Sequence, residues 1–205
     1  MYPQIKRAID VFLSLVLTIL FLPAWIFVPI AIYLESGWPV IYRHKRVGQF
    51  GQEFWLYKFR TMVKNADEVL YQKDKKLFQK FKKQDWKLEN DPRITKLGKL
   101  LRNLTIDEFP QLYNILIGDM SLIGPRAYLK QELKEQTRRY PQTKAWIKEI
   151  LRVKPGVTGP WQTSGRNIIP FDKRAKMDLN YAKHYNLLWD LWILIKTPPA
   201  MISKW

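Results

Sequence analysis

The chain has 205 residues, a formal net charge of +17 and no cysteine. The lack of cysteine excludes disulfides, thiolate zinc sites and cysteine nucleophiles, and the presence of only two histidines argues against a histidine-based metal site or a Ser-His triad. Nine tryptophans, ten tyrosines and ten phenylalanines in so basic a chain favour binding to nucleic acid or to the headgroup region of an anionic membrane.

Residues 11–34 form an uncharged, apolar run of 24 residues, which is long enough to cross a bilayer core of ~30 Å. Pro23 lies in the middle of this run, where proline removes a backbone hydrogen bond and kinks or breaks a helix. Basic residues lie on both sides of the run, and by the positive-inside tendency both of its ends would be cytoplasmic. These features alone leave two interpretations open, a helix that spans the bilayer and a re-entrant helix-break-helix hairpin.

The following segments predict a β-hairpin and then charged helices. Residues 40–47 and 53–61 are rich in β-branched and aromatic side chains, and a short glycine-bearing stretch joins them, which is typical of a hairpin. Residues 63–88 are strongly charged with apolar residues at helical spacing, which predicts one or two exposed helices. Residues 93–102 predict a basic amphipathic helix.

A further helix is predicted to begin near residues 105–107 and to stop at Gly118. Thr105, with Glu108 three residues later, matches the capping-box pattern. Pro110 is tolerated only in a first turn, which fits this start.

The C-terminal part predicts loops over residues 121–126 and 154–170, because glycine and proline recur in both. Helices are predicted over residues 130–139, 142–151 and 172–185. The apolar segment 187–196 is too short to span a bilayer, and its two tryptophans fit an interfacial membrane helix as well as a buried core helix. The pair Pro198-Pro199 predicts the end of this helix.

Two adjacent carboxylates, Asp107 and Glu108, lie at the predicted helix start in this basic chain. An ionised carboxylate among so many cations is expected to lie close to an anion, and phosphate is the anion that Lys, Arg and a helix N-terminus bind together. Such a carboxylate can attack phosphorus to give an acyl phosphate. The alternative is that both residues merely start the helix, and a Glu108 that closes a capping box would not also bind a metal.

Basic side chains in four separate segments are candidate phosphate ligands: Lys58, Arg60, Arg102, Arg126 and Arg166. Arg126 and Arg166 lie beside glycine in predicted loops, where backbone can approach a ligand closely. Arginine grips a phosphate with two parallel hydrogen bonds, although each of these residues alone also fits a solvated surface charge. The sequence has no Walker-type loop and no GxGxxG motif, which disfavours ordinary nucleotide-binding folds.

Five motifs follow one another along the chain: residues 57–62 (YKFRTM), 91–98 (DPRITKLG), 104–112 (LTIDEFPQL), 118–126 (GDMSLIGPR) and 154–167 (KPGVTGPWQTSGRN). In this combination and order the chain resembles the bacterial sugar transferases, the monotopic phosphoglycosyl transferases that begin surface-glycan assembly. The resemblance covers essentially the whole chain.

The resemblance implies an α+β fold that is mostly helical, with a re-entrant membrane helix hairpin broken near Pro23, a small β-hairpin and amphipathic interfacial helices. It divides the chain into a re-entrant membrane helix over residues 1–36 and a cytoplasmic, membrane-associated catalytic domain over residues 37–205. The protein would lie at the cytoplasmic face of the bacterial inner (plasma) membrane, against an anionic lipid bilayer, as a monomer or a homo-oligomer.

The resemblance also implies a ping-pong reaction with Mg²⁺ as cofactor. Asp107 would attack the sugar-bearing phosphate of a UDP-sugar, release UMP and carry a phosphosugar, which a polyprenol (undecaprenyl) phosphate would then accept. Glu108 would bind Mg²⁺, and the phosphate-site candidates would be Lys58, Arg60, Arg102, Arg126 and Arg166. The Trp-Gln-Thr-Ser-Gly-Arg form of the last motif is similar to the hexose-1-phosphate branch, which favours UDP-galactose or UDP-glucose.

The chain departs from the family pattern at two positions. Ala127 stands where proline is usual, and Lys154 stands where arginine is usual, so we expect a local backbone change at Ala127 and no change of reaction. Many members of the branch carry extra N-terminal membrane helices, so we expect a minimal form or one from which such an extension was removed.

Two other function classes fit the composition. A membrane-anchored nucleic-acid-binding protein would explain the charge and the aromatic residues, and a non-catalytic membrane scaffold would explain the hydrophobic segment. Neither requires Asp107-Glu108 beside four ordered basic motifs, so we expect an enzyme with no nucleic-acid partner.

Overall fold

The computed structural model describes residues 2–84, 86, 88, 90–165 and 169–201. These residues are mostly helical, as the sequence predicts, with two two-stranded sheets among them. The elements are α1 (Tyr2–Leu20), α2 (Leu22–Ser36), β1 (Ile41–Val47), a 3₁₀ turn (Gln49–Gly51), β2 (Glu53–Phe59), α3 (Ala66–Glu68), a π-helical turn (Val69–Lys73), α4 (Lys75–Lys83), α5 (Lys96–Asn103), a 3₁₀ turn (Ile106–Glu108), α6 (Gln111–Ile117), β3 (Ser121–Ile123), α7 (Lys130–Arg139), α8 (Thr143–Ile150), β4 (Gly156–Thr158), α9 (Phe171–His184) and α10 (Leu187–Met201).

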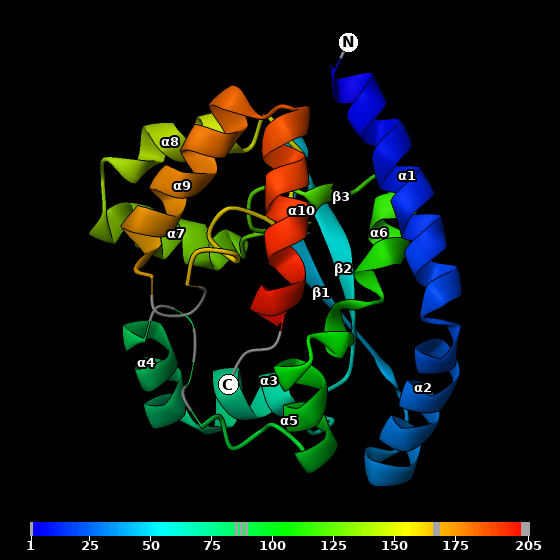
Figure 1. Cartoon of the computed structure of the whole chain (residues 1–205). Coiled ribbons are helices and arrows are strands. Elements are labelled where there is room, and N and C mark those ends of the chain that lie inside the picture. The colour runs from blue at the N-terminus through cyan, green and yellow to red at the C-terminus, as the bar shows by residue number, and fades with distance from the viewer. Residues whose placement is uncertain (1, 85, 87, 89, 166–168, 202–205) are drawn as a thin grey trace.

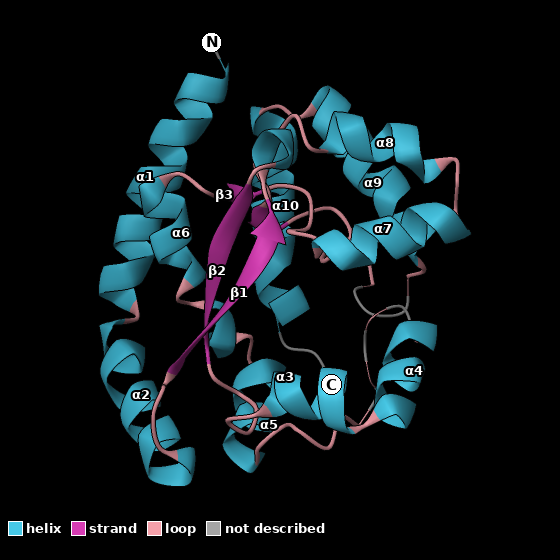
Figure 2. Ribbon diagram, turned by 180° about the vertical axis from the view of Figure 1, so that it is seen from behind, coloured by secondary structure: helices cyan, strands magenta, loops and turns pink. Residues whose placement is uncertain are grey.

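The β1–β2 hairpin lies in the middle of the molecule (Figures 1 and 2). On one side of it are α1, α2 and α6, on the other are α7, α8 and α9, while α3, α4 and α5 gather at one end. A buried core joins the hairpin to α6, β3 and α10 through Leu56, Ile115, Leu122 and Ile193.

The N-terminal hydrophobic segment forms two helices bent by 63° at Phe21, so the predicted break is confirmed. Pro23 lies in the first turn of α2, where its missing N–H would have no intrahelical partner in any case. Among the described residues no single helix has both the length and the apolar character needed to cross a bilayer, whereas α1 and α2 together, as a bent pair, meet that criterion.

Polar side chains on one face of α1 fasten it to the body. The Lys6 Nζ lies 2.6 Å from an Asp190 carboxylate oxygen on α10, and the Asp10 carboxylate accepts from the backbone N–H of Leu122 at 3.0 Å. Arg7 donates to the carbonyl oxygens of Ile115 and Leu116 at the C-terminal end of α6, where a cation also complements the helix dipole. The N-terminal helix is therefore part of the fold, although its outer face is apolar.

The hairpin is confirmed, and its register decides which side chains share a face. The two strands are antiparallel, with Tyr42 opposite Lys58 and His44 opposite Leu56. Because side chains alternate across a strand, Arg46 lies on the same face as these four. All five line one cavity, so this face of the hairpin forms a wall of that cavity.

The two predicted loops at residues 121–126 and 154–170 contain a short parallel strand pair, so the loop prediction was wrong there. Ser121 in β3 is paired with Gly156 in β4, and Ile123 with Thr158. A side chain at Gly124 or Gly156 would overlap backbone of the opposing strand, which explains why these positions are glycine. Strands of three residues are too short to show a period, and only the tertiary fold pairs them.

α10 continues through Pro198 and Pro199 to Met201, so its predicted end was wrong. Two prolines in the last turn remove only two N–H donors, and the Thr197 hydroxyl donates to the Ile193 carbonyl in this region. The sequence left open whether this helix is a buried core helix or an interfacial helix, and the structure shows one buried face and one exposed apolar face. Ile193 is fully buried, whereas Leu188 is 79% exposed.

The predicted charged and basic helices are present as α3, α4 and α5, and the helices predicted for residues 130–151 and 172–185 are confirmed as α7, α8 and α9. α5 approaches the end of β2 very closely, since a Cβ at Gly98 would overlap the Thr61 carbonyl. Arg102 is one turn beyond Gly98 on the same helix face and donates from Nε to the Thr61 hydroxyl at 2.9 Å. This close approach positions Arg102 at the cavity.

Candidate active site

A cavity of about 320 Å³ lies between the hairpin, α5, the 3₁₀ turn Ile106–Glu108 and the loop after β3. Most of the predicted site residues come together in its wall: Lys58, Arg60, Arg102, Asp107, Glu108 and Arg126. Arg166, the remaining candidate phosphate ligand, lies outside the described residues. Residues from four separate segments of the chain thus meet around one concave space.

The turn that carries Asp107 and Glu108 differs from the predicted helix start. Thr105 has a left-handed backbone (φ 58°), residues 106–108 form one 3₁₀ turn, and α6 begins at Gln111 after Pro110. The Thr105 hydroxyl donates to the Met201 carbonyl at 2.8 Å, so the predicted capping box was wrong. A contact with α10, nearly a hundred residues later in the chain, therefore replaces the local one.

Asp107 is a buried carboxylate, with 6% of its surface exposed. Burial raises the pKa of Asp107 to about 6, and this effect outweighs the opposing effect of the Lys58 ammonium, 3.8 Å from the carboxylate. Glu108 raises this pKa further, whereas Arg102 lowers it. At pH 7 the group is mostly ionised and more basic than an ordinary aspartate, and both properties suit a nucleophile.

Glu108 extends toward Lys58 instead of folding back on the helix start. Its Oε1 accepts from the Lys58 ammonium at 2.6 Å, and this ammonium also contacts Asp107. Lys58 therefore bridges the two carboxylates, and Glu108 faces the cavity instead of closing a capping box.

The arginines of the cavity differ in their surroundings. Arg60 is buried, and its guanidinium donates to the Ser36 hydroxyl and the Gly37 carbonyl at 2.6 Å, so it ties the end of α2 to the cavity wall. Burial lowers the pKa of Arg102, an effect that the nearby Asp107 opposes. The Arg126 guanidinium lies over the Trp161 ring, 5.3 Å from its centroid.

Asp178 supports the Arg126 loop from behind. This fully buried carboxylate of α9 accepts from the Tyr128 hydroxyl at 2.8 Å and from the Arg126 backbone N–H at 3.2 Å. Burial raises the pKa of Asp178 to about 7, although both of these hydrogen bonds lower it. Because these bonds are internal, they favour a structural role for Asp178.

Sequence reasoning missed His44 and Arg46, which lie in the same cavity wall as Lys58. Burial, together with the neighbouring Arg46, lowers the pKa of His44 to about 4, so this imidazole is neutral at pH 7. Side-chain alternation in the predicted hairpin could have identified them, because it places residues 42, 44 and 46 on the face of Lys58 once the strand register is known.

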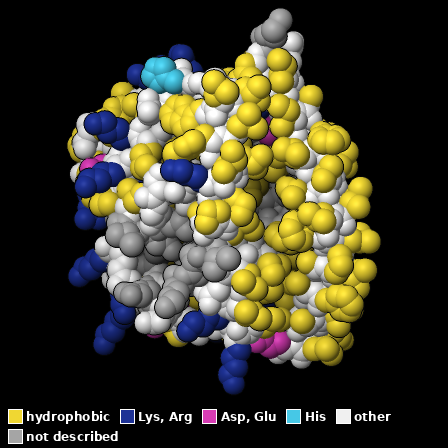
Figure 3. Space-filling model, in the orientation of Figure 1, with side chains coloured by type: hydrophobic (Ala, Val, Ile, Leu, Met, Phe, Trp, Pro, Cys, Tyr) yellow, Lys and Arg dark blue, Asp and Glu magenta, His cyan; other side chains and the backbone are white. Residues whose placement is uncertain are grey.

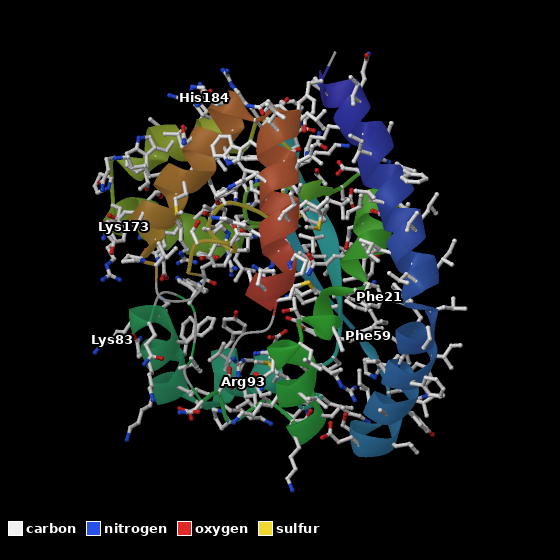
Figure 4. The ribbon with its side chains drawn as sticks, in the orientation of Figure 1. Phe21, Phe59, Lys83, Arg93, Lys173 and His184 are labelled. Atoms are coloured by element: carbon white, nitrogen blue, oxygen red, sulfur yellow. The ribbon has the colours of Figure 1, made fainter. Side chains whose placement is uncertain are left out.

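The bend of the N-terminal pair lies beside the turn that carries Asp107 and Glu108. The Phe21 ring, at the bend, contacts the ring of Phe109 at a centroid distance of 4.7 Å, and Phe109 directly follows Glu108. Phe59, at the end of β2, contacts Trp25 of α2 at 5.7 Å. Figure 4 shows Phe21 and Phe59 in this region, between the N-terminal helices and the body.

Comparison with known proteins identifies the family of this chain. A sequence profile described as "Bacterial sugar transferase" matches residues 1–204. The chain belongs to the bacterial sugar transferase family. The family resemblance drawn from the sequence is therefore confirmed.

Several curated relatives are similar to this sugar transferase over most of its length. It is 40% identical to an undecaprenyl-phosphate galactose phosphotransferase of Salmonella typhimurium, over 98% of this chain and 41% of that protein. It is 38% identical to the exopolysaccharide production protein ExoY of Rhizobium meliloti, over 96% of this chain and 84% of ExoY. A UDP-N-acetylgalactosamine-undecaprenyl-phosphate N-acetylgalactosaminephosphotransferase of Aeromonas hydrophila is 34% identical over 98% of this chain and 44% of its own length. The chain thus spans less than half the length of two of these relatives.

Proposed function

We propose that this sugar transferase moves a hexose 1-phosphate from a UDP-hexose to a polyprenol phosphate and releases UMP. The observation that carries the proposal is the buried Asp107 carboxylate, with Lys58 3.8 Å away and further arginines around the same cavity. The names of the relatives, which act with undecaprenyl phosphate and galactose or N-acetylgalactosamine phosphates, support the substrate class. UDP-galactose or UDP-glucose is the proposed donor, and the product would start polysaccharide assembly.

The proposed reaction has two half-reactions at one phosphorus. In the first, an Asp107 carboxylate oxygen forms a bond to the sugar-bearing phosphorus, and the bond from this phosphorus to the bridging oxygen breaks, so that UMP leaves with the electron pair. In the second, a phosphate oxygen of the polyprenol phosphate forms a bond to the same phosphorus, and the bond to Asp107 breaks, which regenerates the carboxylate. Lys58 and Arg102 would neutralise the charge of the transferred phosphoryl group.

Two carboxylates at the cavity fit a magnesium ion that binds together with a substrate. Mg²⁺ commonly takes one or two carboxylates, and water and phosphate oxygens complete its shell. Asp107 and Glu108 supply such a pair, and the described residues include no group of three or more acidic or histidine ligands that could hold a metal alone. Glu108 is the proposed ligand, and when bound the ion would polarise the diphosphate.

Glu108→Gln is expected to weaken the Mg²⁺ dependence and the activity without unfolding the protein, because Glu108 faces Lys58 and closes no capping box. UMP release titrated against Mg²⁺, together with thermal melting, measures both effects. Glu53→Gln, at an exposed carboxylate on the strand that carries Lys58, is the matched control. A loss of stability of ~1 kcal/mol with unchanged Mg²⁺ dependence would instead assign Glu108 a structural role.

The apolar surface of the N-terminal helices and α10 supports a location at the membrane. Figure 3 shows hydrophobic side chains gathered over α1 and α2, where Ile19 and Phe27 are 73% and 68% exposed. α10 adds Leu188 and Ile195 on its outer face. A re-entrant pair with its bend beside Phe109 would hold Asp107 near the lipid headgroups, where a polyprenol phosphate presents its anionic end. The basic body would then attract anionic lipid, by ~1 kcal/mol per well-placed Lys or Arg.

The proposed activity is tested by UMP release with a panel of UDP-sugars, with and without polyprenol phosphate. Sustained release with one UDP-hexose and only with the acceptor is the expected result. Release with no UDP-sugar, combined with strongly salt-dependent binding of nucleic acid, would favour the nucleic-acid-binding alternative.

We expect both ends of the bent pair to be on the cytoplasmic side. In this cysteine-free chain, Gln4→Cys places a single thiol in the first turn of α1, and Lys45→Cys places one after α2. An impermeant thiol reagent applied to sealed membranes should label both from the same side, and Phe21→Cys at the bend should be protected. Labelling of positions 4 and 45 from opposite sides would establish a spanning pair. Pro23→Ala is expected to reduce the bend and the activity with the lipid acceptor.

A further inference from the structure

Arg46 is a charged cavity residue that has no role in the two half-reactions described above. It lies on β1 on the same face as Tyr42, and Tyr42 is directly opposite Lys58 in β2. Arg46 is four residue steps along the strand from Tyr42, which is ~13 Å. The long Lys58 and Arg46 side chains can therefore approach a diphosphate in the same cavity from two ends.

Arg46 and Arg126 lie close together in the cavity wall. A guanidinium nitrogen of Arg46 donates to the carbonyl of Ala127 at 3.2 Å, and Ala127 is the neighbour of Arg126 in sequence. The two positive charges repel each other, and this repulsion, after burial, helps lower the pKa of Arg46 to about 10. Two adjacent cations in a partly buried site are favourable when an anion lies between them.

Among the described residues, each of the two carboxylates beside this pair, Asp178 and Glu132, has one oxygen in an internal hydrogen bond and one buried oxygen without a partner. Asp178 accepts from the Tyr128 hydroxyl and the Arg126 backbone, and the buried Glu132 accepts from the backbone N–H of Leu129. Glu132 still attracts Arg46 electrostatically. Within the described part of the chain, however, neither arginine has a carboxylate within ion-pair distance, and the Nε of each is buried without a hydrogen-bond partner. The pair thus retains donors for a ligand.

We propose that Arg46 and Arg126 form a second anion subsite, which binds the phosphate of UMP in the first half-reaction and the phosphate of the polyprenol acceptor in the second. This inference rests on the proposed function. The leaving oxygen of UMP and the attacking oxygen of the acceptor both bond to the phosphorus that Asp107 carries, and each lies in line with the Asp107 oxygen. One subsite opposite Asp107 therefore serves both phosphates in turn, while Lys58 and Arg102 serve the transferred group.

The experiment compares Arg46→Gln with Arg43→Gln in the whole 205-residue chain. Arg43 lies on the same strand but on the opposite face, where its guanidinium lies 4.9 Å from the Trp55 ring centroid, so it is a matched control. The probes are UMP and uridine as inhibitors of UDP-hexose turnover, and polyprenol phosphate as the variable acceptor. Uridine lacks the phosphate and separates phosphate binding from binding of the nucleoside.

In Arg46→Gln, the inhibition constant of UMP and the half-saturating concentration of polyprenol phosphate should both rise by about tenfold or more. A change of this size is typical of a lost charge-assisted hydrogen bond. Inhibition by uridine should be unchanged, and Arg43→Gln should behave like the wild type. Arg46→Lys, which keeps the charge but not the planar fork, should give a smaller loss and replaces the Gln variant if that variant melts early.

If Arg46→Gln weakens inhibition by UMP and by uridine equally, or changes neither, the proposal of a phosphate subsite at Arg46 is overturned. If inhibition by UMP weakens but the half-saturating concentration of polyprenol phosphate is unchanged, the claim that the two phosphates share one subsite is overturned. A wild-type protein that releases UMP from no UDP-sugar contradicts the proposed function, whereas an active wild type with an unaffected Arg46→Gln contradicts this inference alone.

Discussion

Asp107→Asn is expected to abolish sugar-phosphate transfer while the protein stays folded. The amide has no carboxylate oxygen that can form the bond to phosphorus, and no other carboxylate of the cavity is equally buried beside Lys58. The wild type mixed with UDP-hexose in the absence of acceptor should gain the mass of one hexose phosphate, and peptide mapping should place it on Asp107. An active Asn variant, or an unmodified wild type under turnover conditions, would contradict the covalent route.

The same substitution should leave the protein as stable as the wild type or make it more stable. Burial raises the pKa of Asp107 to about 6, well above the ordinary value of an aspartate. Because the pKa of Asp107 is higher in the folded state, the neutral carboxyl contributes its full stability below pH ~4, and this contribution is lost as the pH rises through about 6. At neutral pH the ionised group therefore destabilises the fold, on the order of 1–3 kcal/mol. Thermal melting at pH 5 and pH 7.5 should show that the advantage of the Asn variant grows with pH. A folded but inactive variant separates catalysis from stability.

Lys58→Met is expected to lower the rate of the first half-reaction by about 100-fold or more. It should also move the acid limb of the pH–rate profile to higher pH. The ammonium contacts both Asp107 and Glu108 and is a proposed ligand of the transferred phosphate, so its removal takes away transition-state stabilisation. Its charge lowers the pKa of Asp107, so without it that pKa rises further. The ionised nucleophile then disappears at a higher pH.

Pre-steady-state UMP release measured from pH 5 to pH 9 tests this prediction. Lys45→Met is the matched control, because Lys45 lies on the opposite face of the hairpin and its ammonium is 4.0 Å from the exposed Glu53. The wild type should lose activity as the pH falls below about 6, the pKa of Asp107. An unshifted acid limb in the Lys58 variant would show that Lys58 does not set the ionisation of Asp107.

Local patterns in the sequence were sufficient for much of the fold. The hairpin, the break near Pro23 and the helices at residues 130–151 and 172–185 depend on periodicity, turn residues and proline, all of which act within a few residues. The same holds for Lys58, Arg102 and the two carboxylates as candidates, because the ordered motifs marked them before any contact was known. Their convergence in one cavity required the fold.

The errors of sequence reasoning lie where distant segments compete with local ones. Thr105 and Glu108 match a capping box, yet Met201 and Lys58 bind their side chains instead. The sequence predicts loops at β3 and β4 because three-residue strands carry no period, and their pairing joins residues 35 positions apart in the chain.

The sequence by itself determined the chemistry that is available to this protein: two adjacent carboxylates, many cations and no thiol. Only the tertiary structure decided how that chemistry is tuned. Burial raises the pKa of Asp107, and Lys58 reaches it from the hairpin. Arg60 is committed to the end of α2, and Arg46 enters the cavity wall. The physical reason is that desolvation and charge–charge interactions depend on distances between groups far apart in the chain, and these distances do not exist until the chain is folded.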